Sequence, residues 1–296
     1  RLVLEAHHNV MRFNYSWIFM RLWYFCQLLG SALAWAGAGV KRAPKKIQTR
    51  LAYDTGWYFR RLGWGAVKHK LIQCQRDSKW IQRLFLKKHR STIGITAANL
   101  NQYWQESLTI EETLRQKWLH NIKDTSFRGM LELSAGRLLY VLMRATKPRV
   151  MVETGVANGS SSTFILEAFK ANGWGTLHSV DLPVTEDGMT FVPDGKKPGW
   201  LVPDEFQKSW DLRLGDTYKL LPPLLEELKS VDIFMHDSDH SYDCMRFEYE
   251  LGWAKIKPGG WMISDDVNMN RSFFEWQEKQ QTNIMVWANR LGVMKK

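Results

Sequence analysis

Residues 151–163 read MVETGVANGSSST, and this stretch decides how the rest of the chain is arranged. Met151 and Val152 are apolar and mark the end of a buried strand, which the carboxylate of Glu153 follows. The turn 155–159 begins and ends with glycine, and glycine lets the backbone approach a ligand without a Cβ in the way. Serines then lead into an apolar helical run, where free N–H groups and serine N-caps are expected. This pattern predicts a cradle for a nucleotide-like ligand, although a short glycine turn is also common in plain strand–helix connections.

Apolar runs and polar breaks alternate through the second half of the chain. A helix over 127–145 should end before Pro148, because the residue ahead of a proline disfavours helical geometry. The elements expected after it are strands near 149–154, 176–182, 210–215, 232–237 and 261–265, helices over 160–171, 217–229, 241–256 and 271–280, and short terminal strands at about 283–288 and 291–295. This alternation predicts an α/β fold, a Rossmann-like, doubly wound and mostly parallel sheet of seven strands.

Acidic side chains stand where the predicted strands end. They are Glu153, Asp181, Asp216, Asp237 and the pair Asp265 and Asp266. A single Asp after a strand is usually a turn or cap residue. Ligands of open α/β sheets, however, bind beyond the carboxyl ends of the strands. A series of five strands that end in carboxylates therefore predicts a ligand site at that edge.

Five segments of the second half carry a resemblance to a known family. They are VETGVANGSSS (152–162), HSVDL (178–182), LRLGDT (212–217), FMHDSDHSY (234–242) and KPGGWMISDDV (257–267). In this order they resemble the class I S-adenosylmethionine-dependent methyltransferases, and within that class the metal-dependent O-methyltransferases of the catechol and macrocin types. The resemblance covers about 127–296 and does not extend to residues 1–125.

The resemblance implies a binding site for S-adenosylmethionine. Glu153 would meet the amino group of the methionine part, Asp181 would accept both ribose hydroxyls, and Asp216 with Gly215 would lie by the adenine. The implied set of cofactor-binding residues is Glu153, Gly155, Asn158, Gly159, Ser160, Asp181, Gly215 and Asp216.

The resemblance also implies a metal site and a base. Asp237, Asp265 and Asp266 would bind a divalent cation, expected to be Mg²⁺, since this hard ion prefers carboxylate oxygens. The ion would favour loss of the proton from an acceptor hydroxyl. His240 or Asp239 would then accept that proton as the catalytic base.

Some positions depart from the family. Asp266 stands where the family often carries Asn. Base N-methyltransferases usually carry an Asn/Asp-Pro-Pro-aromatic motif after strand four, and Asp237–His240 lacks it, which argues against nucleobase methylation. The loop over about 183–207, with Phe191 and Trp200, matches no known pattern and is expected to close over the site and exclude water.

The first half of the chain is basic and rich in tryptophan. Residues 1–148 carry 25 Lys and Arg against 8 Asp and Glu, whereas residues 149–296 carry 16 against 22. This asymmetry predicts a basic, mainly helical arm over residues 1–125 that faces phosphates, anionic lipid or an acidic partner. The Rossmann-like domain is expected over 126–296.

The arm contains a long apolar stretch. Leu22–Val40 carries no charge, and a bilayer-spanning helix needs roughly 20 such residues. Aromatic residues crowd its start, and basic residues follow from Lys41 onward, as at membrane interfaces. We expect a membrane-embedded segment at about 13–40, with the methyltransferase domain on the cytoplasmic side. A buried or interfacial amphipathic helix is the alternative.

Three interpretations of function stay open. The first is a membrane-associated O-methyltransferase that acts on a hydroxyl of a small molecule or sugar. The second is a methyltransferase-fold subunit with a mainly structural role, which binds other subunits of a membrane complex through residues 1–125. RNA binding by the basic half is weaker, because no aromatic RNP strand, KH-type loop or zinc knuckle is present. Cys26, Cys74 and Cys244 have no metal or disulfide spacing, which predicts a reducing compartment for the C-terminal half.

Overall fold

A computed structural model of the chain describes residues 79–122, 131–183, 190–288 and 290–296. The predicted membrane-embedded segment, about 13–40, lies outside these ranges. No helix within the described ranges combines the length and the apolar character needed to cross a bilayer.

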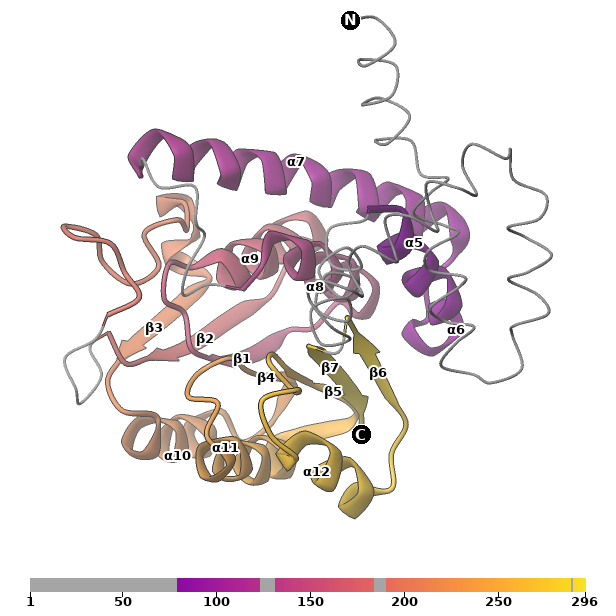
Figure 1. Ribbon diagram of the computed structural model, residues 1–296, viewed down its shortest axis with the longest axis vertical. Coiled ribbons are helices and arrows are strands. Elements are labelled where there is room, and N and C mark those ends of the chain that lie inside the picture. The colour runs from indigo at the N-terminus through magenta and orange to yellow at the C-terminus, as the bar shows by residue number, and fades with distance from the viewer. Residues whose placement is uncertain (1–78, 123–130, 184–189, 289) are drawn as a thin grey trace, which may run out of the picture. The chain divides into compact units, whose positions relative to one another are not determined.

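A central sheet has the strand order β3-β2-β1-β4-β5-β7-β6 (Figure 1). The strands are β1 Val150–Thr154, β2 Thr176–Asp181, β3 Trp210–Leu214, β4 Val231–His236, β5 Ile256–Ser264, β6 Ile284–Trp287 and β7 Leu291–Lys295. Strands β1 to β5 are parallel, and β7 runs antiparallel between β5 and β6. The predicted seven-stranded, mostly parallel sheet is confirmed. Because β2 and β4 flank β1, the strand order reverses there, and such a switch point is where open α/β sheets bind ligands.

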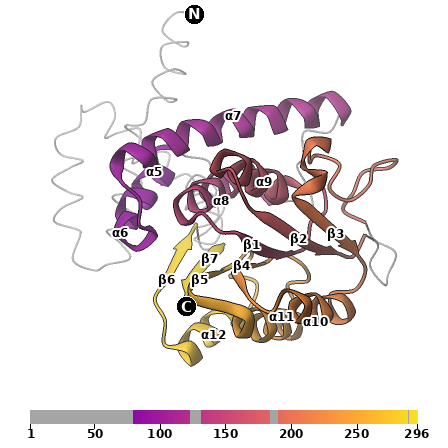
Figure 2. The same cartoon turned by 180° about the vertical axis from the view of Figure 1, so that it is seen from behind.

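Helices cover both faces of the sheet (Figures 1 and 2). They are α5 Lys79–Lys88, α6 Arg90–Ile93, α7 Ala97–Asn121, α8 Leu133–Thr146, α9 Ser160–Asn172, the 3₁₀ helix η1 Asp204–Lys208, α10 Thr217–Leu228, α11 Tyr242–Lys255 and α12 Ser272–Gln280. Helices α8 and α9 lie on one face, with α7 packed on them, and α10, α11 and α12 lie on the other.

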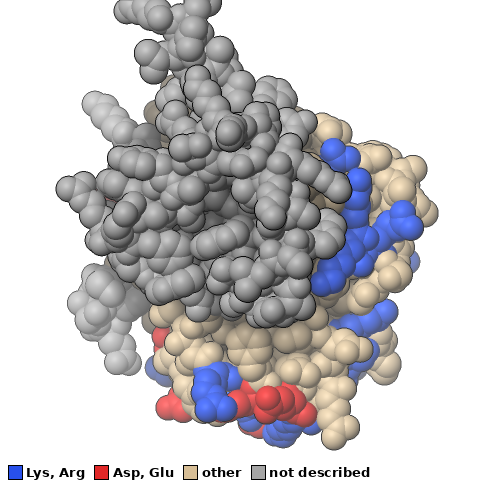
Figure 3. All heavy atoms as spheres, turned by 45° about the vertical axis from the view of Figure 1, so that its right-hand side comes forward, with Lys and Arg blue, Asp and Glu red and all other residues tan. Residues whose placement is uncertain are grey.

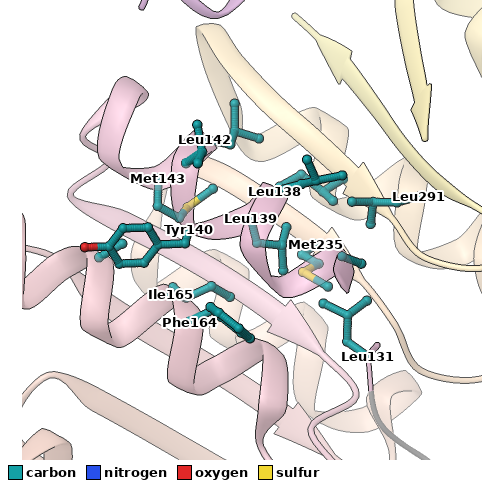
Figure 4. Packing of buried hydrophobic residues seen from close by; sticks show 14 of the residues in the cluster. Leu131, Leu138, Leu139, Tyr140, Leu142, Met143, Phe164, Ile165, Met235 and Leu291 are labelled. Atoms are coloured by element: carbon teal, nitrogen blue, oxygen red, sulfur yellow. The ribbon is translucent and has the colours of Figure 1, made fainter. Parts of the chain in front are cut away.

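The central parallel strands β1 and β4 are buried on both faces. Met151 and Ile233 join the core on the α8–α9 side, whereas their neighbours Val152 and Phe234 join the core on the α10–α12 side. Figure 4 shows the first core, where Leu138 and Leu139 of α8 pack near Met235 of β4 and Leu291 of β7. Full burial of such a side chain contributes about 1.5–3 kcal/mol. The sheet therefore provides a rigid support for the loops at its carboxyl edge.

Part of the sequence assigned to the arm packs on this fold. Helix α7 begins after Thr96, whose side chain accepts a hydrogen bond from the backbone N–H of Asn99 at 3.1 Å, a standard N-cap. Glu111 of α7 pairs with the buried guanidinium of Arg137 on α8. Glu106 pairs in the same way with Arg144, at 3.1 Å. The division of the chain near residue 125 stays a prediction.

Charge is unevenly distributed over the described surface. In the view of Figure 3, Lys and Arg side chains form a band along one flank, and Asp and Glu side chains appear below it. Helix α5 carries Lys79, Lys87 and Lys88 at exposed positions and has no acidic residue in its first turn.

Candidate functional site

The turn between β1 and α9 is the centre of the candidate site. It begins at Gly155 with φ +82° and ends at Gly159 with φ +87°, both in the left-handed region that favours glycine. A Cβ on Gly155 would collide with the backbone carbonyl of Asp237, which follows β4. The turn after β1 therefore lies directly against the turn after β4.

Asp181, the last residue of β2, supports this turn. Its Oδ1 accepts hydrogen bonds from the backbone N–H groups of Val156 at 2.7 Å and Ala157 at 3.1 Å, and its side chain is buried. A charged acceptor of two consecutive N–H groups fixes the shape of the turn. This role was not predicted from the sequence. Ribose binding by Asp181 stays a prediction. The two hydrogen bonds that Oδ1 already accepts limit how this carboxylate could bind a ribose.

Glu153 is fully buried beneath the turn, at the end of β1. Its Oε2 accepts hydrogen bonds from the hydroxyls of Ser162 at 2.7 Å and Ser179 at 2.9 Å. Its Oε1 has no hydrogen-bond partner within the described part of the chain, and neither has the buried hydroxyl of Ser160. Burial raises the pKa of Glu153 to about 7, although the serine hydroxyls oppose the shift. A buried carboxylate oxygen without a partner fits a cationic ligand group, such as the amino group of S-adenosylmethionine.

Asn158 joins the turn to the segment 190–203. Its Oδ1 accepts a hydrogen bond from the indole N–H of Trp200 at 2.6 Å, and its Nδ2 donates to the carbonyl of Phe191 at 3.1 Å. The backbone N–H of Gly199 donates to Ala157, and a Cβ on Gly159 would meet Gly199. Both polar ends of Asn158 are therefore engaged within the chain. Its predicted contact with a cofactor stays a prediction.

Asp216 and Gly215 follow β3. The side chain of Asp216 accepts a hydrogen bond from the backbone N–H of Tyr218 at 2.9 Å, which makes it the N-cap of α10. The backbone N–H of Gly215 donates to the carbonyl of Asp181 at 2.8 Å. Gly215 thus lies next to Asp181, and the side chain of Asp216 has the common capping role. Their place by the adenine stays a prediction.

The acids after β5 are paired with an arginine. The guanidinium of Arg290 lies 2.8 Å from a carboxylate oxygen of Asp265 and 2.8 Å from one of Asp266. The same guanidinium lies 3.4 Å from Glu132. Among the described residues, no group of three or more His, Cys, Asp and Glu side chains is arranged to hold a metal ion. The metal site expected of Asp237, Asp265 and Asp266 stays a prediction, and Arg290, just before β7, places a cation beside two of these carboxylates.

Asp237 follows β4 directly, and its side chain is partly buried, with 13% exposed. Burial, the charge of Asp265 and the charge of Glu153 together hold the pKa of its carboxyl well above the usual range. His240 Nε2 lies 3.8 Å from Asp237 and 3.6 Å from Asp266, beyond hydrogen-bonding distance. An acid of this kind is protonated more readily than a free one, so the cluster carries less negative charge than its sequence suggests.

His240 lies beside the acids, and its role as the catalytic base stays a prediction. Burial, and next the charge of His236, lower the pKa of its imidazole to about 4. It is therefore neutral at neutral pH and able to accept a proton. The other predicted base is engaged locally: Asp239 accepts hydrogen bonds from the backbone N–H of Ser241 at 3.1 Å and from its hydroxyl at 2.7 Å. His240 is consequently the better placed of the two.

Three residues that shape the site, Arg290, His236 and Glu248, were not predicted from the sequence. Arg290 stands just before the last predicted strand, and only an antiparallel arrangement of that strand would have placed it near Asp265. His236 and Glu248 form a buried pair at 2.6 Å behind His240. Glu248 falls on the apolar face of α11 with Cys244, Met245, Tyr249 and Gly252, a pattern that could have marked it as buried.

Comparisons with known proteins agree with the sequence pattern. Residues 152–267 match the family described as a methyltransferase domain. A search among curated proteins finds no match. Similar solved structures include an O-methyltransferase from Bacillus cereus in complex with SAH (15% identity, 64% of this chain and 90% of that chain, TM-score 0.42). Another is the O-methyltransferase TomG from Streptomyces achromogenes (13% identity, 63% of this chain and 87% of that chain, TM-score 0.43). A third is a putative caffeoyl-CoA O-methyltransferase from Staphylococcus aureus (14% identity, 62% of this chain and 99% of that chain, TM-score 0.45).

Proposed function

We propose that this protein transfers the methyl group of S-adenosylmethionine to a hydroxyl oxygen of a small molecule or sugar, as the match of residues 152–267 to a methyltransferase-domain family supports. One observation carries the proposal. Glu153 Oε1 is buried beside the glycine turn without a hydrogen-bond partner in the described residues. An unpaired buried carboxylate oxygen is costly, and an ammonium group would remove that cost.

The residues around the turn suit this ligand. Glu153 would hold the ammonium group, whose positive charge would lower the pKa of Glu153 and keep it ionised. The glycines at 155 and 159 leave backbone without Cβ atoms at the turn, and Asp181 holds the turn in shape. When bound, S-adenosylmethionine supplies an electrophilic methyl group.

His240 is the residue that would accept the proton of the acceptor hydroxyl. Its Nε2 lies near Asp237 and Asp266 at the carboxyl edge of the sheet, and its lowered pKa keeps it neutral at neutral pH. General-base catalysis of this kind contributes about 10²–10⁴-fold. A divalent cation is not part of the proposal, because Arg290 occupies the carboxylates that would bind it.

Membrane association is a second element of the proposal. It rests on the uncharged stretch Leu22–Val40 and the basic residues that follow it. The same composition supports the alternative, in which the chain is mainly a structural subunit of a membrane assembly. The two differ in cofactor binding, because a purely structural subunit needs no S-adenosylmethionine.

Titration calorimetry of the full chain with S-adenosylmethionine tests the proposal. We expect binding by the wild type and a loss of about 10- to 100-fold in affinity for Glu153→Gln, since a charge-assisted contact is removed. Glu112→Gln, an exposed position on α7, is the control and should bind as the wild type does. Absence of binding by the wild type, or equal affinities for the wild type and Glu153→Gln, would contradict the proposal.

A further inference from the structure

Arg290 is held in place by its backbone. Its N–H donates to the carbonyl of Trp287 at 2.9 Å, and its own carbonyl accepts from the N–H of Val267 at 2.9 Å. Because β7 runs antiparallel to β5 with Ser264 opposite Gly292, the residue just before β7 lies opposite the residues just after β5. The sheet register therefore fixes Arg290 beside Asp265 and Asp266.

The guanidinium uses several of its donors on these acids. Nη2 lies 2.8 Å from Asp265 Oδ2, and Nε lies 3.1 Å from the same oxygen and 2.8 Å from Asp266 Oδ1. Nη1 reaches Glu132 Oε1 at 3.4 Å. The Asp265 side chain is only 1% exposed and that of Arg290 is 25% exposed, so water screens these contacts weakly.

A guanidinium and a divalent ion compete for this place. Both bind the same carboxylate oxygens, and a Mg²⁺ ion demands a close, nearly octahedral set of oxygen ligands. A bound ion would also repel the fixed positive charge of Arg290. Burial alone would lower the pKa of Arg290, but the charge and hydrogen bonds of Asp265, with Asp266, raise it above its usual value, so the arginine keeps its charge.

From this geometry we infer that Arg290 takes the place of the divalent cation: it is the resident cation of the acid cluster, and the chain needs no metal ion at Asp237, Asp265 and Asp266. Arg290 is a positioning residue that keeps Asp265 and Asp266 in place. One consequence is that methyl transfer survives chelation, and this rests on the function proposed above. The other is that Mg²⁺ does not change the stability of the folded protein, and this does not depend on the proposed function.

Thermal unfolding of the full chain in EDTA and in 10 mM MgCl₂ or MnCl₂ tests the inference. The wild type should unfold at the same temperature in all three solutions. Arg290→Met should unfold at a lower temperature and should become stabilised by Mg²⁺, because Asp265 and Asp266 lose the guanidinium that neutralises them. Arg290→Lys keeps the charge and should remain insensitive to Mg²⁺. A metal response of Arg290→Met separates loss of the cation from a merely structural loss of packing.

A second measurement covers the case in which Arg290→Met does not fold. Calorimetric titration of the wild type with MgCl₂ alone should show no saturable binding. Saturable Mg²⁺ binding or a rising unfolding temperature in the wild type would overturn the inference, as would an Arg290→Met variant that folds and ignores Mg²⁺. If no acceptor is ever methylated, the proposed function fails, while these metal measurements still decide the inference.

Discussion

The Nδ1 atom of His236 lies 2.6 Å from a carboxylate oxygen of Glu248, and neither side chain is exposed to solvent. Glu248 also accepts hydrogen bonds from the hydroxyls of Thr154, Thr217 and Ser238. Burial favours protonation of Glu248, but the charge of His236 and these hydrogen bonds hold its pKa below the usual range. One carboxylate thus joins β1, β4, α10 and α11 directly behind the candidate site.

Glu248→Gln should lower the free energy of unfolding by about 2–4 kcal/mol, since it removes a buried carboxylate that is hydrogen-bonded to His236 and to three hydroxyl groups. Denaturation of the full chain in urea measures this loss. Glu250→Gln on the exposed side of the same helix is the matched control, with an expected change within about 0.5 kcal/mol. Equal losses for the two variants would refute a structural role for the His236–Glu248 pair.

Glu153 should make the ligand-free protein less stable as pH rises. Its pKa is about 7 in the folded state against 4.5 for a free carboxyl, so between these values the folded state binds more protons than the unfolded state. Stability then falls through this window, by roughly 3 kcal/mol at most, and Glu153→Gln should lack this fall. Unfolding temperatures of both proteins at pH 5 and pH 8 test the sign. Equal pH dependences of the wild type and Glu153→Gln would show that the fold does not raise the pKa of Glu153.

Gly155 and Gly173 have the same backbone angle, φ +82°, but different surroundings. A Cβ at Gly155 meets the backbone of Asp237, whereas a Cβ at Gly173 meets no atom within 4 Å. Gly173→Ala should therefore cost about 1–2 kcal/mol for the left-handed backbone alone. Gly155→Ala should cost more than about 3 kcal/mol, because backbone strain and steric clash add. Urea denaturation compares them, and a Gly155→Ala variant as stable as Gly173→Ala would disprove the close packing of the two turns.

His240 should produce the opposite pH dependence. Its pKa is about 4 in the folded state against 6.5 for a free imidazole, so between these values the unfolded state binds more protons. Stability therefore rises with pH through this window, by roughly 2–3 kcal/mol. His240→Gln should show a flatter rise between pH 4 and pH 6.5 in thermal unfolding. If the two curves rise equally, the imidazole is not held neutral by the fold.

Local features of the sequence determined much of the site. The end of β1, the glycine turn and the start of α9 appear where MVETGVANGSSST predicts them, because glycine conformation and helix capping act over a few residues. Glu153, Asp181, Asp237 and Asp265 come to one edge because each ends a parallel strand. These features follow from the spacing of residues along the chain.

Local rules did not decide between roles where a side chain had two available. Asp216 and Asp239 both follow strands, and both accept hydrogen bonds from backbone N–H groups two residues ahead. Asn158 was expected to contact a cofactor, and it holds Trp200 and Phe191. Short polar side chains after a strand satisfy nearby backbone donors first, because such bonds need little ordering of the chain.

The sequence by itself determined the order of strands and helices, the glycine turn and the carboxylates at the sheet edge. Only the tertiary structure decided the charge balance there. Insertion of β7 antiparallel between β5 and β6 brings Arg290 to Asp265 and Asp266 across 25 and 24 residues of chain. No spacing rule predicts that pairing, because the partner of a strand depends on which sheet edge remains open once the parallel strands have packed.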